Sequence, residues 1–343
     1  MKRIHFVEIF LMLFVVFLIF NYNIRLTDDI SRHFKLFMSI KERITAEEYL
    51  FYYRENYTNF IFYMIIVFFK KLKINFIWIV VMITITYYGV IFYLINNEER
   101  IKLKEKILLL TLVFMIINPF YILTVLHYPL AIIFICFALI FRRKRIKLLE
   151  GICILFSYYT HTGTIYIIIT YLLLRINIIF SILKNFLMKK KKLGIFMGLL
   201  LIFNSLFLEK ILINFVQVTN NIYLKNKISA YILKKDIIKS FYGGLGLGQL
   251  LAIFYMSIIL IITYLLSKKE KFTFEHVFSY ILLMGCLVLT SINNIFLIRA
   301  IYVLIFIYPI LYKSIGKEKR VIINVLILFS LIFLREYKFL LSL

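Results

Sequence analysis

Apolar residues in this chain gather in long runs, and short polar or basic stretches separate one run from the next. The runs lack the strict alternation of half-buried strands and are long enough to be membrane-crossing helices. They cover residues 5–21, 75–95, 107–123, 128–141, 148–160, 164–180, 194–208, 247–266, 275–290, 293–312 and 321–334. The pattern predicts an all-α polytopic membrane protein of about eleven transmembrane helices, forming one integral membrane domain over residues 1–343.

The run at residues 59–69 is about eleven residues long, which suits an interfacial or re-entrant helix rather than a span. If this run crossed the membrane, every later loop would change sides. Cytoplasmic loops are enriched in Lys and Arg, so the loop charges decide between the two topologies. With the N-terminus inside and this run on the outer face, the basic loops all lie inside. These loops hold Arg100–Lys106, Arg142–Lys147, Lys184–Lys192, Lys268–Lys271 and Lys313–Arg320. The chain is therefore predicted to be multi-pass, with a cytoplasmic N-terminus and an external C-terminus.

This topology leaves two long outer loops, residues 22–74 and 209–246. Both are too apolar to be disordered tails. Tyrosines in the first loop suit amphipathic helices at the headgroup level, where the ring is buried and the hydroxyl stays wet. These tyrosines are Tyr49, Tyr52, Tyr53 and Tyr57.

Composition supports a membrane class, since 63% hydrophobic residues leave too little polar surface for a soluble globule of this length. The net charge of +25 would suggest nucleic acid in a soluble domain. Here the cations cluster between apolar runs, so topology explains them and no nucleic-acid partner is expected. The cysteines lie singly within apolar runs and indicate no disulfide framework. The first run lacks a cleavage pattern and is expected to be a retained helix.

The first outer loop opens with a charged segment, Arg25 to His33. Asp28 and Asp29 stand between two arginines there, and paired carboxylates could position a sugar hydroxyl or act as a base. Arg32 could pair with a phosphate. The alternative is a solvated turn that caps a helix beside the membrane.

Two histidines fall at predicted outer helix ends. His127 stands before Tyr128 and Pro129 in a tight turn, and His161 is flanked by threonines and Gly163. An imidazole at a membrane edge could be a general base, or a donor to phosphate when protonated. Either histidine could instead be a satisfied polar group at a helix end.

Arg299 lies several residues inside the run at 293–312, where a buried guanidinium needs an anion or water. A lipid-linked phosphate would supply that anion. Lys225 opens a group of lysines interleaved with tyrosines that could bind a lipid headgroup or an anionic glycan; a solvated basic face is the alternative. The glycines at 243–248 lack the Lys-Ser/Thr of a phosphate-binding loop. The five histidines are dispersed and form no metal-ligand motif, so catalysis is expected to be metal-independent or to use a weakly held ion, and no cofactor is expected.

The order of these features resembles the EpsG-like family of exopolysaccharide polymerases, which are related in kind to Wzy-type O-antigen and capsule polymerases. The resemblance covers most of the chain. It rests on the acidic first loop, Arg54–Tyr57 before an aromatic outer helix, Pro129–Ala131, His161, Arg299–Tyr302 and Pro309. The chain departs from the family at His127, where an arginine is usual, and in lacking a glycine before the acidic pair.

The resemblance implies a GT-C-like glycosyltransferase on the outer face of a bacterial plasma membrane. Its substrate would be a polyprenyl-pyrophosphate-linked oligosaccharide, and its surroundings membrane lipid and other polysaccharide-assembly proteins. Asp28, Asp29 and His161 are then expected to be catalytic. The residues expected to bind pyrophosphate or glycan are Arg299, Arg32, His127, Tyr302 and Lys225.

Two other classes stay open from the residues alone. A flippase or transporter of lipid-linked oligosaccharide would place ionisable residues near the bilayer midplane and usually shows an internal repeat. An outer-face transferase that modifies glycans would be expected to show a stronger nucleophile or metal pattern.

Overall fold

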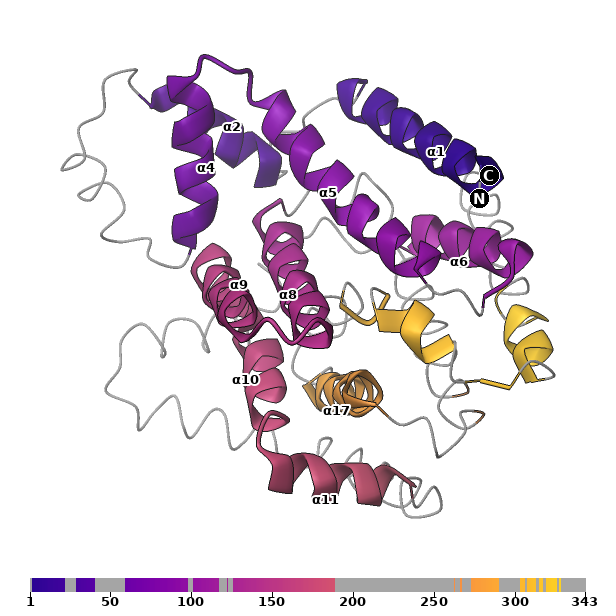
Figure 1. Cartoon of the computed structure of the whole chain (residues 1–343). Coiled ribbons are helices and arrows are strands. Elements are labelled where there is room, and N and C mark those ends of the chain that lie inside the picture. Colours follow the sequence, from indigo (N-terminus) through magenta and orange to yellow (C-terminus); the bar gives the residue numbers. More distant parts are fainter. Residues whose placement is uncertain are drawn as a thin grey trace, which may run out of the picture. The chain divides into compact units, whose positions relative to one another are not determined.

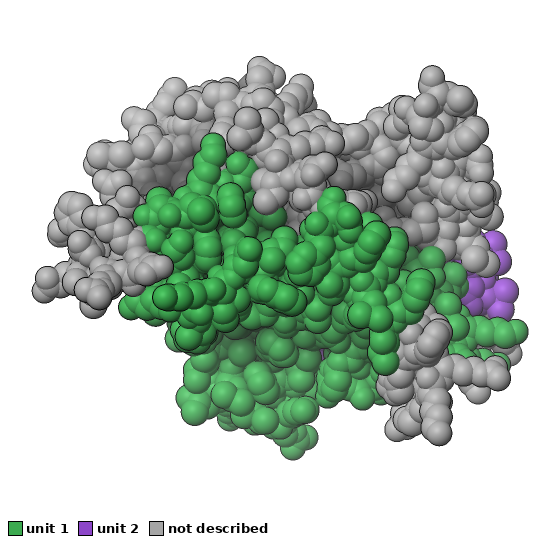
Figure 2. All heavy atoms as spheres, turned by 90° about the horizontal axis from the view of Figure 1, so that it is seen from above, with its two compact units in different colours: residues 1–169 green, residues 170–343 purple. Residues whose placement is uncertain are grey.

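The structure is a computed structural model of the whole chain, and it is helical with no extended strand in the part that it describes (Figure 1). That part comprises residues 2–21, 29–40, 59–97, 101–116, 122, 126–188, 262, 266, 273–289, 303–305, 307–312, 315–316, 319–325 and 327. The all-α prediction is confirmed for these residues. The chain divides into two compact units, residues 1–169 and residues 170–343 (Figure 2).

Unit 1 holds the helices that precede the division, which falls within α10. They are α1 (Lys2–Phe20), α2 (Asp29–Ser39), α4 (Phe60–Lys71), α5 (Ile77–Asn96), α6 (Leu103–Ile116), α8 (His127–Arg143), α9 (Lys147–Thr160) and the short 3₁₀ helix η2 (Thr162–Thr164). In this unit α5 packs against α1, α4, α6 and α8, so it is the central helix. Its buried residues include the large rings of Tyr87 and Tyr88.

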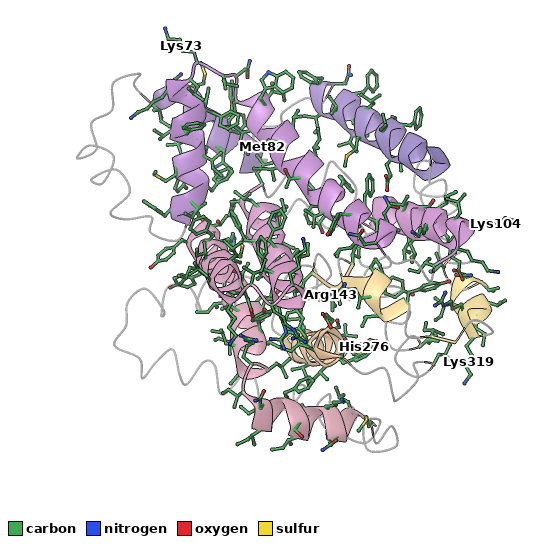
Figure 3. The ribbon with its side chains drawn as sticks, in the orientation of Figure 1. Lys73, Met82, Lys104, Arg143, His276 and Lys319 are labelled. Atoms are coloured by element: carbon green, nitrogen blue, oxygen red, sulfur yellow. The ribbon has the colours of Figure 1, made fainter. Side chains whose placement is uncertain are left out.

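The bounds of α5 follow from polar residues at both ends of one apolar run. At the start, the side-chain Oδ1 of Asn75 accepts the backbone N–H of Ile77 at 3.1 Å. This bond satisfies one of the amides that a helix start leaves without an intrahelical partner. Asn96 is the last residue, and its side-chain amide donates to the buried carboxylate of Glu8 in α1. Figure 3 shows Lys73 projecting outward before α5 and Lys104 projecting after it, at the start of α6.

Helices α8 and α9 form an antiparallel hairpin. Lys144 and Arg145 make a tight turn between them, and Arg145 has the positive φ of 59° that reverses the chain there. Arg142 and the buried carboxylate of Glu150 lie 3.9 Å apart across the turn. Because the two helices are of similar length, the start of α8 and the end of α9 meet at the opposite end of the hairpin.

The run predicted as one span over 164–180 is divided into two helices, so the prediction of one continuous helix there was wrong. The structure has α10 (Ile165–Leu173) and α11 (Asn177–Met188), whose axes differ by 93°. Arg175 and Ile176 donate backbone N–H groups to Leu172 and Leu173, which closes short turns in place of the helical ladder.

Unit 2 contains α11 and α17 (Phe274–Leu289), which pack together. The Tyr171 ring meets Phe274 and Phe278 edge-on, with centroids 5.3 and 5.9 Å apart. At the start of α17 the hydroxyl of Thr273 donates to Glu275 Oε2 at 2.6 Å. This unit also has helical residues at 303–305, 307–312 and 319–325.

Length distinguishes the helices as candidate spans. A helix of 20 residues is about 30 Å long, which matches the hydrocarbon core of a bilayer. Among the described residues, α5 alone is both long and apolar enough to cross a membrane, and α10 with α11 would qualify only if the bent pair counts as one span. The helix α4, at 12 residues, is too short to span, as predicted for the run at 59–69.

Candidate functional site: a cluster of three histidines

The structure brings three of the five histidines together at one end of the α8–α9 hairpin. His33 comes from α2, His127 is the first residue of α8, and His161 follows α9. Within the part of the chain that is described, no other group of histidines meets in this way. The residues are far apart in sequence, so tertiary packing creates the cluster.

His33 and His127 share a hydrogen bond. Nε2 of His33 lies 3.2 Å from Nδ1 of His127, and either nitrogen can carry the proton. The imidazole of His33 is 5% exposed and meets the Phe62 ring of α4 edge-on, with 4.6 Å between centroids. Phe62 also lies against His127, at 5.9 Å. The Phe62 ring of α4 therefore packs against the imidazoles of both His33 and His127.

His161 stacks on His127. Their ring centroids are 4.6 Å apart and their planes differ by 13°. The Tyr128 ring stands almost perpendicular to His161 at 5.2 Å. His161 is 8% exposed. His127 is thus the middle member, joined to one neighbour by a hydrogen bond and to the other by ring stacking.

The backbone around His161 explains how its ring is held. His161 is the C-cap of α9 with extended backbone angles, φ −161° and ψ 110°, and its N–H still donates to Ser157. The chain then turns immediately into η2. Thr164 closes this turn by donating both its backbone N–H, at 3.0 Å, and its hydroxyl, at 2.7 Å, to the carbonyl oxygen of His161.

The same turn binds the imidazole of His161. Nδ1 accepts the backbone N–H of Gly163 at 2.7 Å. A nitrogen that accepts a hydrogen bond presents its lone pair, so the proton of the neutral ring is on Nε2. The small residues Gly163 and Thr164 around this histidine therefore fix the orientation of its ring as well as its backbone.

The charged segment that contains Asp28 and Asp29 ends at His33, a member of the cluster. Asp29 is the first residue of α2 and precedes His33 by four residues, about one helical turn. Arg32 is the residue before His33. The predicted site residues outside the described part of the chain are Asp28, Lys225, Arg299 and Tyr302.

His33 is the site residue that the sequence reasoning missed. It ends the charged segment that begins at Arg25, but only Asp28, Asp29 and Arg32 of that segment were assigned a role. The available signal was its position one helical turn after Asp29, on a short amphipathic stretch. A helix beginning at the acidic pair would have placed the imidazole on the same face as a carboxylate.

The cluster offers nitrogen donors and acceptors in a nearly dry environment, which suits binding an anionic oxygen or carrying a proton. Among the described residues no group of three His, Cys, Asp or Glu side chains has the geometry to hold a metal ion. The stacked arrangement of His127 and His161 agrees with this, because parallel rings do not direct their nitrogens at one point.

Comparisons of the chain with protein-family models, with curated proteins and with solved structures gave no match. The resemblance to EpsG-like polymerases therefore stays a prediction based on the short motifs in the sequence.

Proposed function

We propose that the protein is a membrane glycosyltransferase that polymerises polyprenyl-pyrophosphate-linked oligosaccharide repeat units into a surface polysaccharide. One observation carries the proposal. Helices α2, α8 and α9 bring together His33, His127 and His161, so the end of the charged segment Arg25–His33 meets the two histidines of the predicted site.

The apolar surface of the helices supports a membrane location. On α1, six large apolar side chains are exposed, and water would disfavour such a stripe. They are Ile9, Phe10, Leu13, Phe14, Phe17 and Phe20. Leu148 of α9 is 75% exposed and Ile178 of α11 is 72% exposed. Lipid contact explains these side chains, and about eleven spans with a cytoplasmic N-terminus is the arrangement we propose.

The proposed mechanism divides two tasks between the predicted residues. Arg299, helped by Arg32, stabilises the departing polyprenyl pyrophosphate by charge-assisted hydrogen bonds. Asp28, Asp29 or a histidine of the cluster orients or deprotonates the acceptor hydroxyl. The glycosidic bond forms as the bond from the sugar to pyrophosphate breaks. No resident cofactor enters this scheme.

The proposed substrate determines where the enzyme would act and which partners it would meet. A polyprenyl-linked glycan is presented at a bilayer surface, so the enzyme would act on the outer face of a bacterial plasma membrane. Membrane lipid and other polysaccharide-assembly proteins are the proposed partners. Tyr302 and Lys225 complete the proposed binding site for pyrophosphate and glycan.

The test is the length distribution of the surface glycan and of the lipid-linked glycan in a deletion strain. The strain is complemented with wild type, with Arg299→Ala or with Lys319→Ala. Lys319 is an exposed cation of the same C-terminal region and provides the matched control. We expect long polymer with wild type and Lys319→Ala, and single repeat units outside the membrane with Arg299→Ala.

Two results would contradict the proposal. Repeat units that accumulate on the cytoplasmic side would indicate a flippase. An unchanged length distribution in the deletion strain would indicate a modifying transferase or a non-catalytic partner. Each variant is first checked for normal amounts of protein in the membrane fraction, so that a folding defect is not read as a catalytic one.

A further inference from the structure

The hydrogen bond between Gly163 and His161 restricts what His161 can do in the proposed reaction. The Gly163 N–H points at Nδ1 from 2.7 Å. The Nδ1–H tautomer and the imidazolium would both direct a second N–H at this donor, and two donors cannot satisfy each other. The N–H that His161 can offer a substrate is therefore Nε2–H.

Packing preserves this arrangement. The ring is stacked on His127 on one side and meets the Tyr128 edge on another, and its burial leaves little space for rotation about χ2. The backbone amide of Gly163 is itself held in η2 by the bonds from Thr164 to the His161 carbonyl. A flip that turned Nδ1 away would leave the partly buried amide of Gly163 without this acceptor.

We propose that His161 acts as a neutral hydrogen-bond donor through Nε2–H, held in that tautomer by the Gly163 amide, and that it is not the general base. Its target is an anionic oxygen of the lipid-linked pyrophosphate substrate. This inference rests on the proposed function. Gly163 is a positioning residue, because it acts through the imidazole of His161.

If His161 is a hydrogen-bond donor, the general base must be another group of the site. A ring whose Nδ1 accepts a bond and whose Nε2 carries the proton has no lone pair for the acceptor hydroxyl. The proton then goes to the carboxylates of the acidic pair or to the pair formed by His33 and His127. The site thus separates binding of the leaving group from proton removal.

Glutamine and asparagine substitutions distinguish a donor from a base. The side-chain amide of His161→Gln reaches the position of imidazole Nε2 and donates there. In His161→Asn the amide reaches only the Nδ1 position, where its oxygen can accept the Gly163 N–H. Neither amide can accept a proton in catalysis. A donor role therefore predicts partial rescue by Gln alone, whereas a base role predicts loss in both variants.

The assay is glycan length in the deletion strain, with His276→Gln of α17 as the control for a buried histidine outside the cluster. We expect His161→Gln to keep polymer yield within about tenfold of wild type and His161→Asn to lose about 100-fold or more. Equal loss in both variants, with external accumulation of single repeat units, would overturn the donor assignment and leave the proposed function intact. Unchanged polymer in both variants would remove His161 from the site.

The tautomer itself is measurable in the full chain. Nitrogen NMR of protein labelled with ¹⁵N-histidine in lipid nanodiscs separates protonated from unprotonated ring nitrogens, and the chain has only five histidines. The His161 signals are those lost in His161→Gln. We expect a protonated Nε2 and an unprotonated Nδ1. A protonated Nδ1 would overturn the inference whatever the polymer assay shows, and the NMR result does not depend on the proposed function.

Discussion

The imidazole rings of His127 and His161 lie face to face, with 4.6 Å between their centroids and 13° between their planes. His127 contributes to the cluster in two separable ways. Its ring face packs on His161, and its Nδ1 shares a hydrogen bond with His33. A substitution that keeps the ring and removes the nitrogens can therefore separate packing from hydrogen bonding.

We expect His127→Phe to keep the stacking contact and lose function. The phenyl ring still packs on His161 and Phe62, but Nε2 of the buried His33 loses its partner, which costs about 1–3 kcal/mol. Polymer yield and the thermal unfolding temperature in detergent are both measured. If His127→Phe polymerised like wild type, the ring face would be the only part of His127 that matters.

His33 is expected to position His127, and amide substitution tests this. In His33→Gln the side-chain amide reaches the place of Nε2 and can still bond to His127, whereas His33→Leu keeps the volume without the bond. We expect His33→Gln to retain most polymer synthesis. His33→Leu is expected to lower the polymer yield about tenfold. This factor corresponds to about 1.4 kcal/mol, which is the usual energy of one hydrogen bond to a buried group. Loss of the same size in both variants would show that only the shape of His33 matters.

The convergence of His127 and His161 could have been predicted from the sequence. The basic turn at residues 144–146 lies about midway between them, so two antiparallel helices of similar length bring them to the same end. Their ring stacking could not be predicted, because it depends on how each helix is rotated about its axis. The joining of His33 to them depends on the packing of α2 and α4, which local spacing does not encode.

The same contrast holds for the helices. The span predicted at 75–95 agrees with α5 because Asn75 and Asn96 mark both ends of one apolar run. The run at 164–180 gave no comparable stop signal. A single charged residue such as Arg175 can be accommodated in an apolar helix, so it does not predict a break. The bend becomes evident only from the turn at residues 174–176 in the structure.

The contact between Glu8 and Asn96 is expected to hold α1 against α5. Asn96→Leu removes the donor and leaves the buried carboxylate of Glu8 without that hydrogen bond, which costs about 1–3 kcal/mol. The double variant Glu8→Leu with Asn96→Leu removes both partners and should recover part of the loss. Thermal unfolding of the four proteins gives the coupling energy. Ile9→Ala, at an exposed position of α1, is the control and should have little effect; strictly additive losses would show that the pair is uncoupled.

Arg145 is expected to be a strained position in the α8–α9 turn. A left-handed backbone costs a residue with a Cβ about 1–2 kcal/mol, and glycine avoids that cost. We expect Arg145→Gly to raise stability by about 1 kcal/mol, measured as a higher unfolding temperature. Lys144→Gly is the matched control, because it removes one positive charge from the same turn at an ordinary φ of −79°. Equal effects in the two variants would argue that charge, and not backbone strain, governs this turn.

The proposed orientation makes a prediction about the two ends of α5. Lys73 precedes this helix and Lys104 follows it, and both side chains are exposed (Figure 3). In a background with Cys136, Cys153 and Cys286 replaced by alanine, Lys73→Cys should react with an impermeant maleimide on intact cells. Lys104→Cys should react only after the cells are opened, since the loop before α6 is rich in cations and is expected to be cytoplasmic. Labelling of the two cysteines in the reverse order would invert the topology, whereas labelling from one side would show that α5 does not cross the membrane. That result would also argue against a lipid-linked substrate, because such a substrate lies in the bilayer and reaches the three histidines only if the protein is embedded there.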